Sequence, residues 1–134
     1  MRKPGYFATF RGTDYEVHIL GRTWVEIRPD AVKGDLRRDF PGAIEYGSDD
    51  GRPWLRLPED ALDRYYSVRV NATWYGEPVW VEGIGDDGLI GIGYLGSSDF
   101  ARTHGLRGQE REGFFGEVPE AELSEIRVTE KDLL

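Results

Sequence analysis

Two histidines are the residues best suited by type to general acid–base catalysis or metal binding. His18 alternates with Glu16 in a strand-like segment, so we expect it to face solvent. His104 follows a possible short helix, whose negative end favours a cation at that place. A metal site would need a third ligand close to both histidines. The sequence therefore predicts no metal site.

Two pairs of adjacent aspartates have the residue type for calcium binding or for hydrolysis by paired carboxylates. Asp49-Asp50 and Asp86-Asp87 each directly precede a glycine, which is typical of a tight turn. Neither turn has the alternating oxygen ligands and distal glutamate of a calcium loop. A hydrolase that takes its two carboxylates from different parts of the fold stays open as an alternative.

Residues 83–88 match the pattern Gly-x-Gly-x-x-Gly. In a nucleotide site these glycines follow a strand and open a helix, whereas here an Asp-Gly turn and a second apolar run follow. The two aspartates in the loop would also repel a phosphate, so we interpret the segment as the tip of a hairpin. The chain has no cysteine, no P-loop lysine and no nucleophile elbow. We therefore predict that it is not an enzyme and needs no cofactor.

The charge of the chain is negative and uneven. Its net charge of −8 makes nucleic acid an improbable partner. Residues 1–66 hold 11 Lys/Arg and 12 Asp/Glu, whereas residues 67–134 hold 6 and 13. The acidity of the second half serves either solubility or the steering of a basic partner. No apolar segment has the length of a signal peptide core or a membrane span, so we expect a cytoplasmic protein without membrane contact.

Four tryptophans are candidates for the core or for binding a partner. Trp24, Trp54 and Trp74 are expected mainly in the core. Trp80 alternates with Val79 and Val81, which predicts that its ring points away from the core. An outward tryptophan is typical of a binding hot spot, although the neighbouring half of the chain would equally cover it.

The candidate binding residues combine acidic side chains, which would steer a basic partner, with aromatic anchors. All of them lie in the second half of the chain. The acidic set is Asp86, Asp87, Asp99, Glu110, Glu112 and Glu117, and the anchors are Trp80 and Phe114.

Two pairs of similar segments indicate an internal repeat. Residues 8–17 align with residues 72–81 at an offset of 64, and both pass from an apolar run through a glycine to an alternating run. Residues 57–62 align with residues 118–123 at an offset of 61, and both read apolar-Pro-Glu-x-x-Leu. We therefore divide the chain into a first repeat, 1–66, and a second, 67–134, which are either separate or fused into one domain.

Each repeat is expected to contain about five strands, divided by turns, with a short helical turn before the last strand. In the second repeat Ser97 or Ser98 is the predicted N-cap of a helix over residues 97–102. In the first, residues 30–33 are expected to form a helical turn. The last strand of the first repeat is expected to continue directly into the second. The remaining expected strands cover residues 6–11, 14–20, 23–28, 43–46, 53–57, 65–70, 68–75, 78–84, 89–95, 110–115, 116–118 and 126–128.

This layout resembles two tandem SH3-like small barrels, packed together, in a mainly β fold. The resemblance lies in Tyr6-Phe7-Ala8-Thr9-Phe10 at the start and in residues 113–119, followed by Ala121-Glu122-Leu123, near the end. The peptide-binding residues of SH3 domains are not convincingly present, so recognition of proline-rich peptides is not implied. In length and acidity the chain also resembles small acidic actinobacterial proteins, some of which are similar to immunity proteins of polymorphic toxin systems.

Together these features favour a non-enzymatic protein-binding module. The resemblance implies an immunity-type inhibitor that covers a basic toxin or nuclease. Two alternatives remain: a small-molecule or sugar-binding barrel, which would include the two-carboxylate hydrolase, and a structural component of a larger assembly. The sequence names neither the partner nor the oligomeric state.

Overall fold

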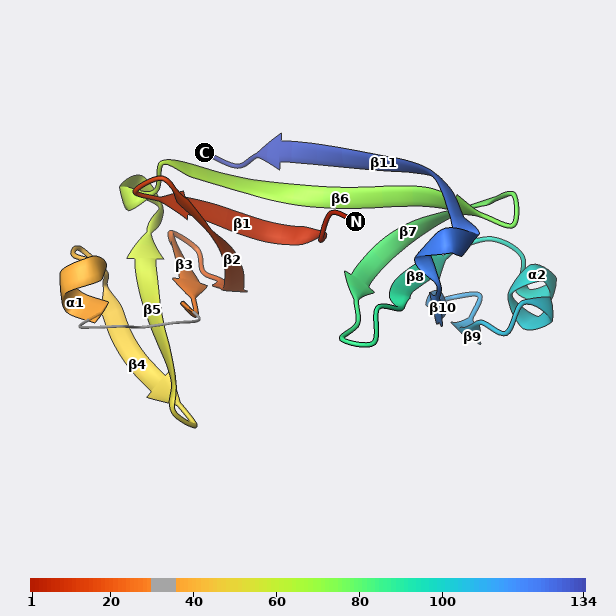
Figure 1. Ribbon diagram of the computed structural model, residues 1–134, viewed down its shortest axis with the longest axis horizontal. Coiled ribbons are helices and arrows are strands. Elements are labelled where there is room, and N and C mark those ends of the chain that lie inside the picture. Colours follow the sequence, from red (N-terminus) through yellow and green to blue (C-terminus); the bar gives the residue numbers. More distant parts are fainter. Residues whose placement is uncertain (30–35) are drawn as a thin grey trace. The chain divides into compact units, whose positions relative to one another are not determined.

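The computed structural model describes residues 1–29 and 36–134, and the helical turn expected at 30–33 lies outside these residues. The described chain divides into two compact units. The N-terminal unit comprises residues 5–67 and 131–134, and the C-terminal unit comprises residues 1–4 and 68–130. The two units are labelled by their elements in Figure 1.

The N-terminal unit is an antiparallel arrangement in the strand order β4-β5-β3-β2-β1. Hairpins join β1 to β2, β2 to β3 and β4 to β5, as the turn residues in this part of the chain predict, and β5 pairs back with β3. The elements are β1 (Gly5–Phe10), β2 (Thr13–Leu20), β3 (Trp24–Ile27), α1 (Leu36–Asp39), β4 (Glu45–Asp49), β5 (Arg52–Pro58) and the 3₁₀ turn η1 (Glu59–Ala61).

The C-terminal unit has the strand order β6-β7-β8-β10-β9, and β11 also pairs with β6. Its elements follow one another in a similar order of strands, a short helix, a hairpin and a 3₁₀ turn. They are β6 (Arg64–Trp74), β7 (Glu77–Ile84), β8 (Ile90–Tyr94), α2 (Ser98–Thr103), β9 (Arg107–Gln109), β10 (Gly113–Val118), η2 (Glu120–Glu122) and β11 (Leu123–Asp132).

Tight two-residue turns connect several of the hairpins. Asp50 and Gly51 have φ values of 50° and 77°, and they link the strand ends Asp49 and Arg52. Tyr75 and Gly76, with φ values of 47° and 80°, do the same between β6 and β7. Two successive positive φ values match the twist of the flanking strands, and glycine adopts them without steric cost. The turns predicted at these glycines are therefore confirmed.

Strand β6 is continuous over 11 residues. It begins at Arg64 in the N-terminal unit and ends at Trp74 in the C-terminal unit. The sequence predicted that the last strand of the first half runs directly into the first strand of the second, and the structure confirms this. Val68, Val70 and Ala72 alternate on its buried side.

The two Pro-Glu-x-x-Leu segments adopt closely similar backbone conformations. Pro58 and Pro119 precede the 3₁₀ turns with φ/ψ values of −66°/147° and −64°/143°. Leu62 and Leu123 follow the turns, and each is 8% exposed. The proline fixes the entry to the turn, and the leucine anchors its exit in the core of its own unit.

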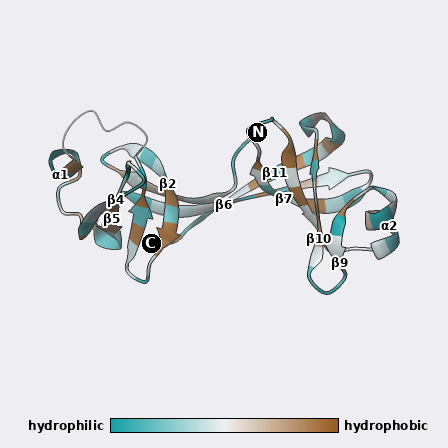
Figure 2. Ribbon diagram, turned by 90° about the horizontal axis from the view of Figure 1, so that it is seen from below, coloured by the Kyte–Doolittle hydropathy of each residue, from teal (hydrophilic) through white to brown (hydrophobic). Residues whose placement is uncertain are grey.

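Each unit buries apolar side chains that alternate along its strands. Strands with hydrophobic residues are brown in the ribbon of Figure 2. In the N-terminal unit, Val25, Ile27, Leu55 and Leu57 are fully buried. In the C-terminal unit Ile90, Ile92, Tyr94 and Val118 are buried.

The chain ends belong to units opposite to their place in the sequence. Leu133 packs against the N-terminal core, and its backbone N–H donates to the carbonyl of Tyr65 at 2.8 Å. The amino group of Met1 lies 3.4 Å from Glu120 in the C-terminal unit. The boundary between residues 67 and 68 is one residue from the predicted one, but the two ends were not expected to exchange.

The mainly β class is confirmed, with antiparallel pairing. Among the described residues the strands form an open order, so two closed SH3-like barrels stay a prediction. The late hairpin expected at 110–118 differs in detail, because the turn lies at residues 110–112 and β10 is one strand from Gly113 to Val118. The three turn residues are charged and exposed, whereas Gly116 is buried within the strand under Leu106.

Candidate functional site: an acidic groove beside Trp80

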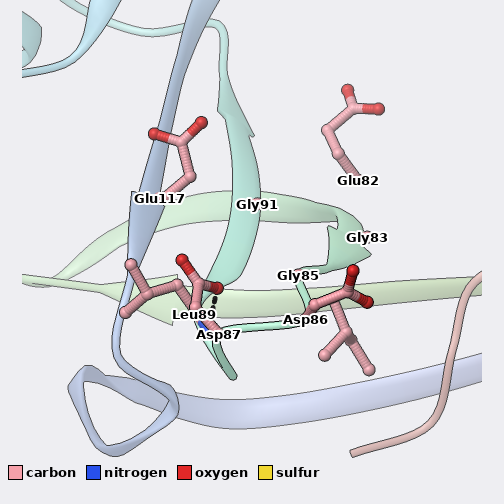
Figure 3. A pocket seen from close by; sticks show the side chains of 9 residues that line it. Glu82, Gly83, Gly85, Asp86, Asp87, Leu89, Gly91 and Glu117 are labelled. Atoms are coloured by element: carbon pink, nitrogen blue, oxygen red, sulfur yellow. Dashed lines mark hydrogen bonds between the residues drawn. The ribbon is translucent and has the colours of Figure 1, made fainter.

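A groove of about 590 Å³ lies over the β7–β8 hairpin and the end of β10 (Figure 3). Its charged lining residues are all acidic: Glu82, Asp86, Asp87 and Glu117. The side chains of these four residues surround a floor that contains three glycines. The volume falls within the range of small ligand sites, and the groove is open enough to admit a protein side chain. The remaining lining residues are Gly83, Ile84, Gly85, Leu89 and Gly91.

The β7–β8 turn carries Asp86 and Asp87, and it holds the side chain of Asp87 in place. Asp87 Oδ1 accepts a hydrogen bond from the backbone N–H of Leu89 at 3.0 Å. The N–H of Gly85 donates to the carbonyl of Leu89 at 2.8 Å and closes the loop. These bonds are local, as expected where an aspartate initiates a turn. The Gly-x-Gly-x-x-Gly segment is thus a hairpin tip, as predicted.

The glycine floor follows from the alternation of β8. Ile90, Ile92 and Tyr94 point into the core, so Gly91 and Gly93 occupy the outward face. Trp80 covers Gly93, whereas Gly91 has no side chain to fill the groove next to the acidic rim.

Trp80 lies on this outward face next to the groove. Val79 and Val81 are 3% and 4% exposed, so the half-buried indole lies on the opposite side of β7, as the alternation predicts. The ring covers Gly93, its cross-strand partner, and meets Phe115 edge to face at a centroid distance of 6.2 Å. The indole N–H donates to Glu82. This hydrogen bond ties an aromatic surface to the acidic rim.

Three of the four rim carboxylates lack a compensating cation. Within the described residues, Glu82, Asp86 and Asp87 make no ion pair. Glu117 pairs with Arg107 through contacts of 2.9 and 3.0 Å. This hydrogen bond raises the pKa of Arg107. Because both partners are exposed, the pair contributes little to stability, and a stronger partner would displace Arg107 readily.

The corresponding face of the N-terminal unit is internally neutralised. Arg56 donates to Glu26 at 3.3 Å and to Glu45 at 3.0 Å. Arg28 donates to Asp49 at 3.1 Å. These carboxylates therefore already have cationic partners, whereas three of the four in the groove do not.

Assigning the chain ends to the units in which they pack changes the charge balance. The C-terminal unit holds seven Lys/Arg and twelve Asp/Glu, a net charge of −5. The N-terminal unit holds ten and thirteen, a net charge of −3. The units thus differ by two charges, whereas the sequence halves differ by six. The unpaired carboxylates on the rim of the groove, rather than net charge, therefore mark this part of the C-terminal unit.

The structure brings together only part of the predicted binding set. Asp86, Asp87 and Glu117 line the groove, and Trp80 lies beside it. Asp99 is on α2 and does not line the groove. Glu110 and Glu112 lie in the β9–β10 turn, which joins β10 at Gly113, about 13 Å along the strand from Glu117 at the usual strand rise.

Phe114 is buried, contrary to the prediction that it is an anchor for a partner. It is 5% exposed and packs in the core, where its ring lies 6.3 Å from that of Tyr94. A partner cannot reach it without unfolding the strand. Its neighbour Phe115, 38% exposed, faces outward instead. Phe114 and Val118 lie four residues apart on β10 and therefore on the same face of the strand. This alternation in the sequence already indicates that Phe114 faces the core.

Glu82 is a rim residue that the predicted set omitted. It lies two positions after Trp80 on the same strand, and such residues share one face of a sheet. The outward orientation predicted for Trp80 therefore already implied that Glu82 would lie beside it.

No protein-family model, curated protein or solved structure matches the chain. Two further findings concern the described residues: no three potential ligand side chains are grouped to hold a metal ion, and no helix is long and apolar enough to cross a membrane. The candidate site therefore rests on its own geometry and charge.

Proposed function

We propose that the protein is a non-enzymatic binding module and that its acidic groove receives basic side chains of a protein partner. The observation that carries this proposal is the set of three uncompensated carboxylates, Glu82, Asp86 and Asp87, beside the half-buried ring of Trp80. Acidic side chains accelerate the encounter with a basic surface, and an aromatic ring supplies contact area after docking.

The partner class that fits best is a basic toxin or nuclease, which this protein would cover as an immunity-type inhibitor in the cytoplasm. A nuclease must carry a basic surface to hold the phosphates of its substrate. An acidic groove would compete with those phosphates for the cationic side chains of the nuclease, and it needs no catalytic groups to do so. In length and acidity the chain resembles small acidic proteins, some of which are similar to immunity proteins, and this resemblance favours the same class.

Hydrolysis by two carboxylates is the weaker candidate for this groove. A glycosidase general acid needs a carboxyl group whose pKa is raised by an apolar, water-poor environment. Glu82, Asp86, Asp87 and Glu117 are all exposed. Such carboxylates are suited to long-range attraction rather than to proton transfer in a closed site.

The test uses two double variants of equal charge change. Asp86→Asn/Asp87→Asn removes two rim charges, and the asparagine retains an oxygen that accepts from Leu89 N–H. Glu110→Gln/Glu112→Gln removes two charges outside the groove. Each protein is used to capture partners from native lysate, and association with the captured protein is followed by stopped flow at several salt concentrations.

We expect a basic partner whose association is slowed about tenfold at low salt by the first pair and much less by the second. The difference should fade at high salt, where exposed charges are screened. An acidic partner, or equal slowing by both double variants, would contradict the proposal for the groove.

A further inference from the structure

A second pocket, of about 400 Å³, lies on the other side of strand β7 from the acidic groove. It is formed between β6 and β7, and all of its lining residues belong to the C-terminal unit. Trp80 contributes to its wall. The lining residues are Pro4, Val68, Arg69, Val70, Asn71, Trp80 and Val81.

The charge in this pocket is opposite to that of the groove. Arg69 is its only charged lining residue. It is exposed, and among the described residues it has neither an ion pair nor a hydrogen bond to a side chain. An uncompensated guanidinium in the more acidic of the two units is available to an external anion.

Asn71 adds a second donor on the same face. It lies two residues after Arg69 on β6, so the two side chains project to the same side about 6.6 Å apart. Its side-chain amide makes no hydrogen bond to another described residue. Asn71 is also the cross-strand partner of Trp80, which places the indole next to the amide.

The chemistry of these three side chains selects a carboxylate on an apolar stem. A guanidinium offers a planar pair of N–H donors that matches the two oxygens of a carboxylate. Trp80 cannot donate its indole N–H here, because Glu82 already accepts it. The ring therefore offers an apolar surface, which Pro4 extends.

We propose that this pocket binds an aspartate or glutamate side chain of the partner whose basic side chain enters the acidic groove. The inference rests on the proposed function, and it adds the requirement that the partner present an anionic as well as a cationic side chain. The partner segment carries a cation and an anion that lie on opposite sides of Trp80. Such an arrangement rejects segments that are only basic, because Arg69 would then be left against a cation.

The experiment titrates small probe molecules for the pocket and for the groove into the ¹⁵N-labelled full chain, and heteronuclear NMR follows their binding. Benzoate carries a carboxylate on an apolar ring, benzamide is its neutral counterpart, and benzylammonium carries the opposite charge. The reporters for the pocket are the Trp80 indole N–H and the Asn71 side-chain amide. The reporters for the groove are the backbone amides of Gly85 and Gly91.

We expect benzoate to shift the pocket reporters saturably, and benzamide to do so much more weakly. Arg69→Gln should weaken benzoate binding about tenfold, because it removes a charge-assisted bidentate contact. Arg102→Gln, which removes an exposed charge on α2 in the same unit, should leave benzoate binding unchanged.

Benzoate that leaves the pocket reporters unshifted, or that binds Arg69→Gln as well as the unaltered protein, would overturn the inference. The probes separate this failure from failure of the proposed function. If benzylammonium shifts the groove reporters while benzoate shifts nothing, the groove stands and the carboxylate pocket falls. If only benzoate binds, the pocket is a carboxylate site and the basic partner of the groove is contradicted.

Discussion

Trp80 lies over Gly93 so closely that a Cβ atom at position 93 would stand 2.1 Å from the indole Cε2. The two residues face each other across β7 and β8. The N-terminal unit has the same relationship, since a Cβ at Gly47 would stand 2.1 Å from Cζ2 of Trp54. In both units a glycine allows a large aromatic ring to lie flat on the outer face of the sheet.

Gly93→Ala should therefore displace Trp80 from its position beside the groove. The added methyl group overlaps ring carbons, and overpacking of this kind costs about 1–3 kcal/mol of unfolding free energy. We expect a large shift of the Trp80 indole NMR signal and weaker binding of the partner. Gly83→Ala is the matched control for the indole signal and for the free energy of unfolding, because a Cβ there meets no atom within 4 Å. It is not a control for binding, because Gly83 lines the groove. Equal effects of the two substitutions on the indole signal and on stability would contradict the packing argument.

Local features of this site could be predicted from the sequence. The Asp-Gly turn placed Asp86 and Asp87 at a hairpin tip, and alternation along β7 placed Trp80 outward. Alternation along β10 also predicts the buried position of Phe114, whereas its aromatic type alone favours a binding anchor.

Long-range features were beyond the sequence. The exchange of the chain ends depends on β11 pairing with a strand about 50 residues earlier, which no local pattern specifies. Likewise, the neutralisation of Glu26 by Arg56 joins two strands that are 30 residues apart. Net charge per segment could not reveal which carboxylates remain unpaired, and this is the property that distinguishes the groove.

The buried carboxylate of Glu26 makes Arg56 important for stability. Glu26 is 2% exposed, and Arg56 Nε lies 3.3 Å from it, whereas Arg28 is 4.0 Å away. Arg56→Met leaves this charge with the more distant cation only. We expect a loss of about 2–4 kcal/mol in the free energy of unfolding, measured by urea titration.

Two comparisons isolate the ion pair from the packing of Arg56 on Trp24 and Trp54. Arg38→Met removes an exposed pair with Asp39 and should cost less than about 1 kcal/mol. In a Glu26→Leu background, Arg56→Met should also cost much less than in the unaltered chain. The same cost in both backgrounds would show that the aromatic contacts, and not the buried charge, account for the loss.

Tyr65 should make the protein lose stability at alkaline pH. Burial raises the pKa of its hydroxyl above the ordinary value of 10.0, and the negative charges of Glu59 and Tyr6 raise it further. The folded state thus favours the neutral phenol. This contribution is fully present below pH 10 and is lost as pH rises through the higher folded pKa.

Tyr65→Phe should remove that part of the pH dependence. The free energy of unfolding of the variant, measured in urea at pH 8 and pH 11, should fall less between the two values than that of the unaltered chain. Tyr75→Phe changes a tyrosine that is 59% exposed, and it should leave the fall unchanged. A fall in Tyr65→Phe as large as in the unaltered chain would assign the alkaline loss to other groups.

Leu133 should stabilise the N-terminal unit although it is the second-last residue of the chain. It is half-buried against that unit's core, and its backbone is held by Tyr65 while Asp132 accepts from Arg64 at 2.8 Å. Leu133→Ala should cost about 1 kcal/mol, roughly half the value of a fully buried leucine. Leu134→Ala is the matched control, because that side chain is 64% exposed.

Hydrogen exchange distinguishes a local effect of Leu133→Ala from a general one. Amides of β3 and β5 should lose protection in this variant, while those of β8 and β10 keep it. Unchanged protection of β5 would mean that the C-terminal residues do not support the unit against which they pack.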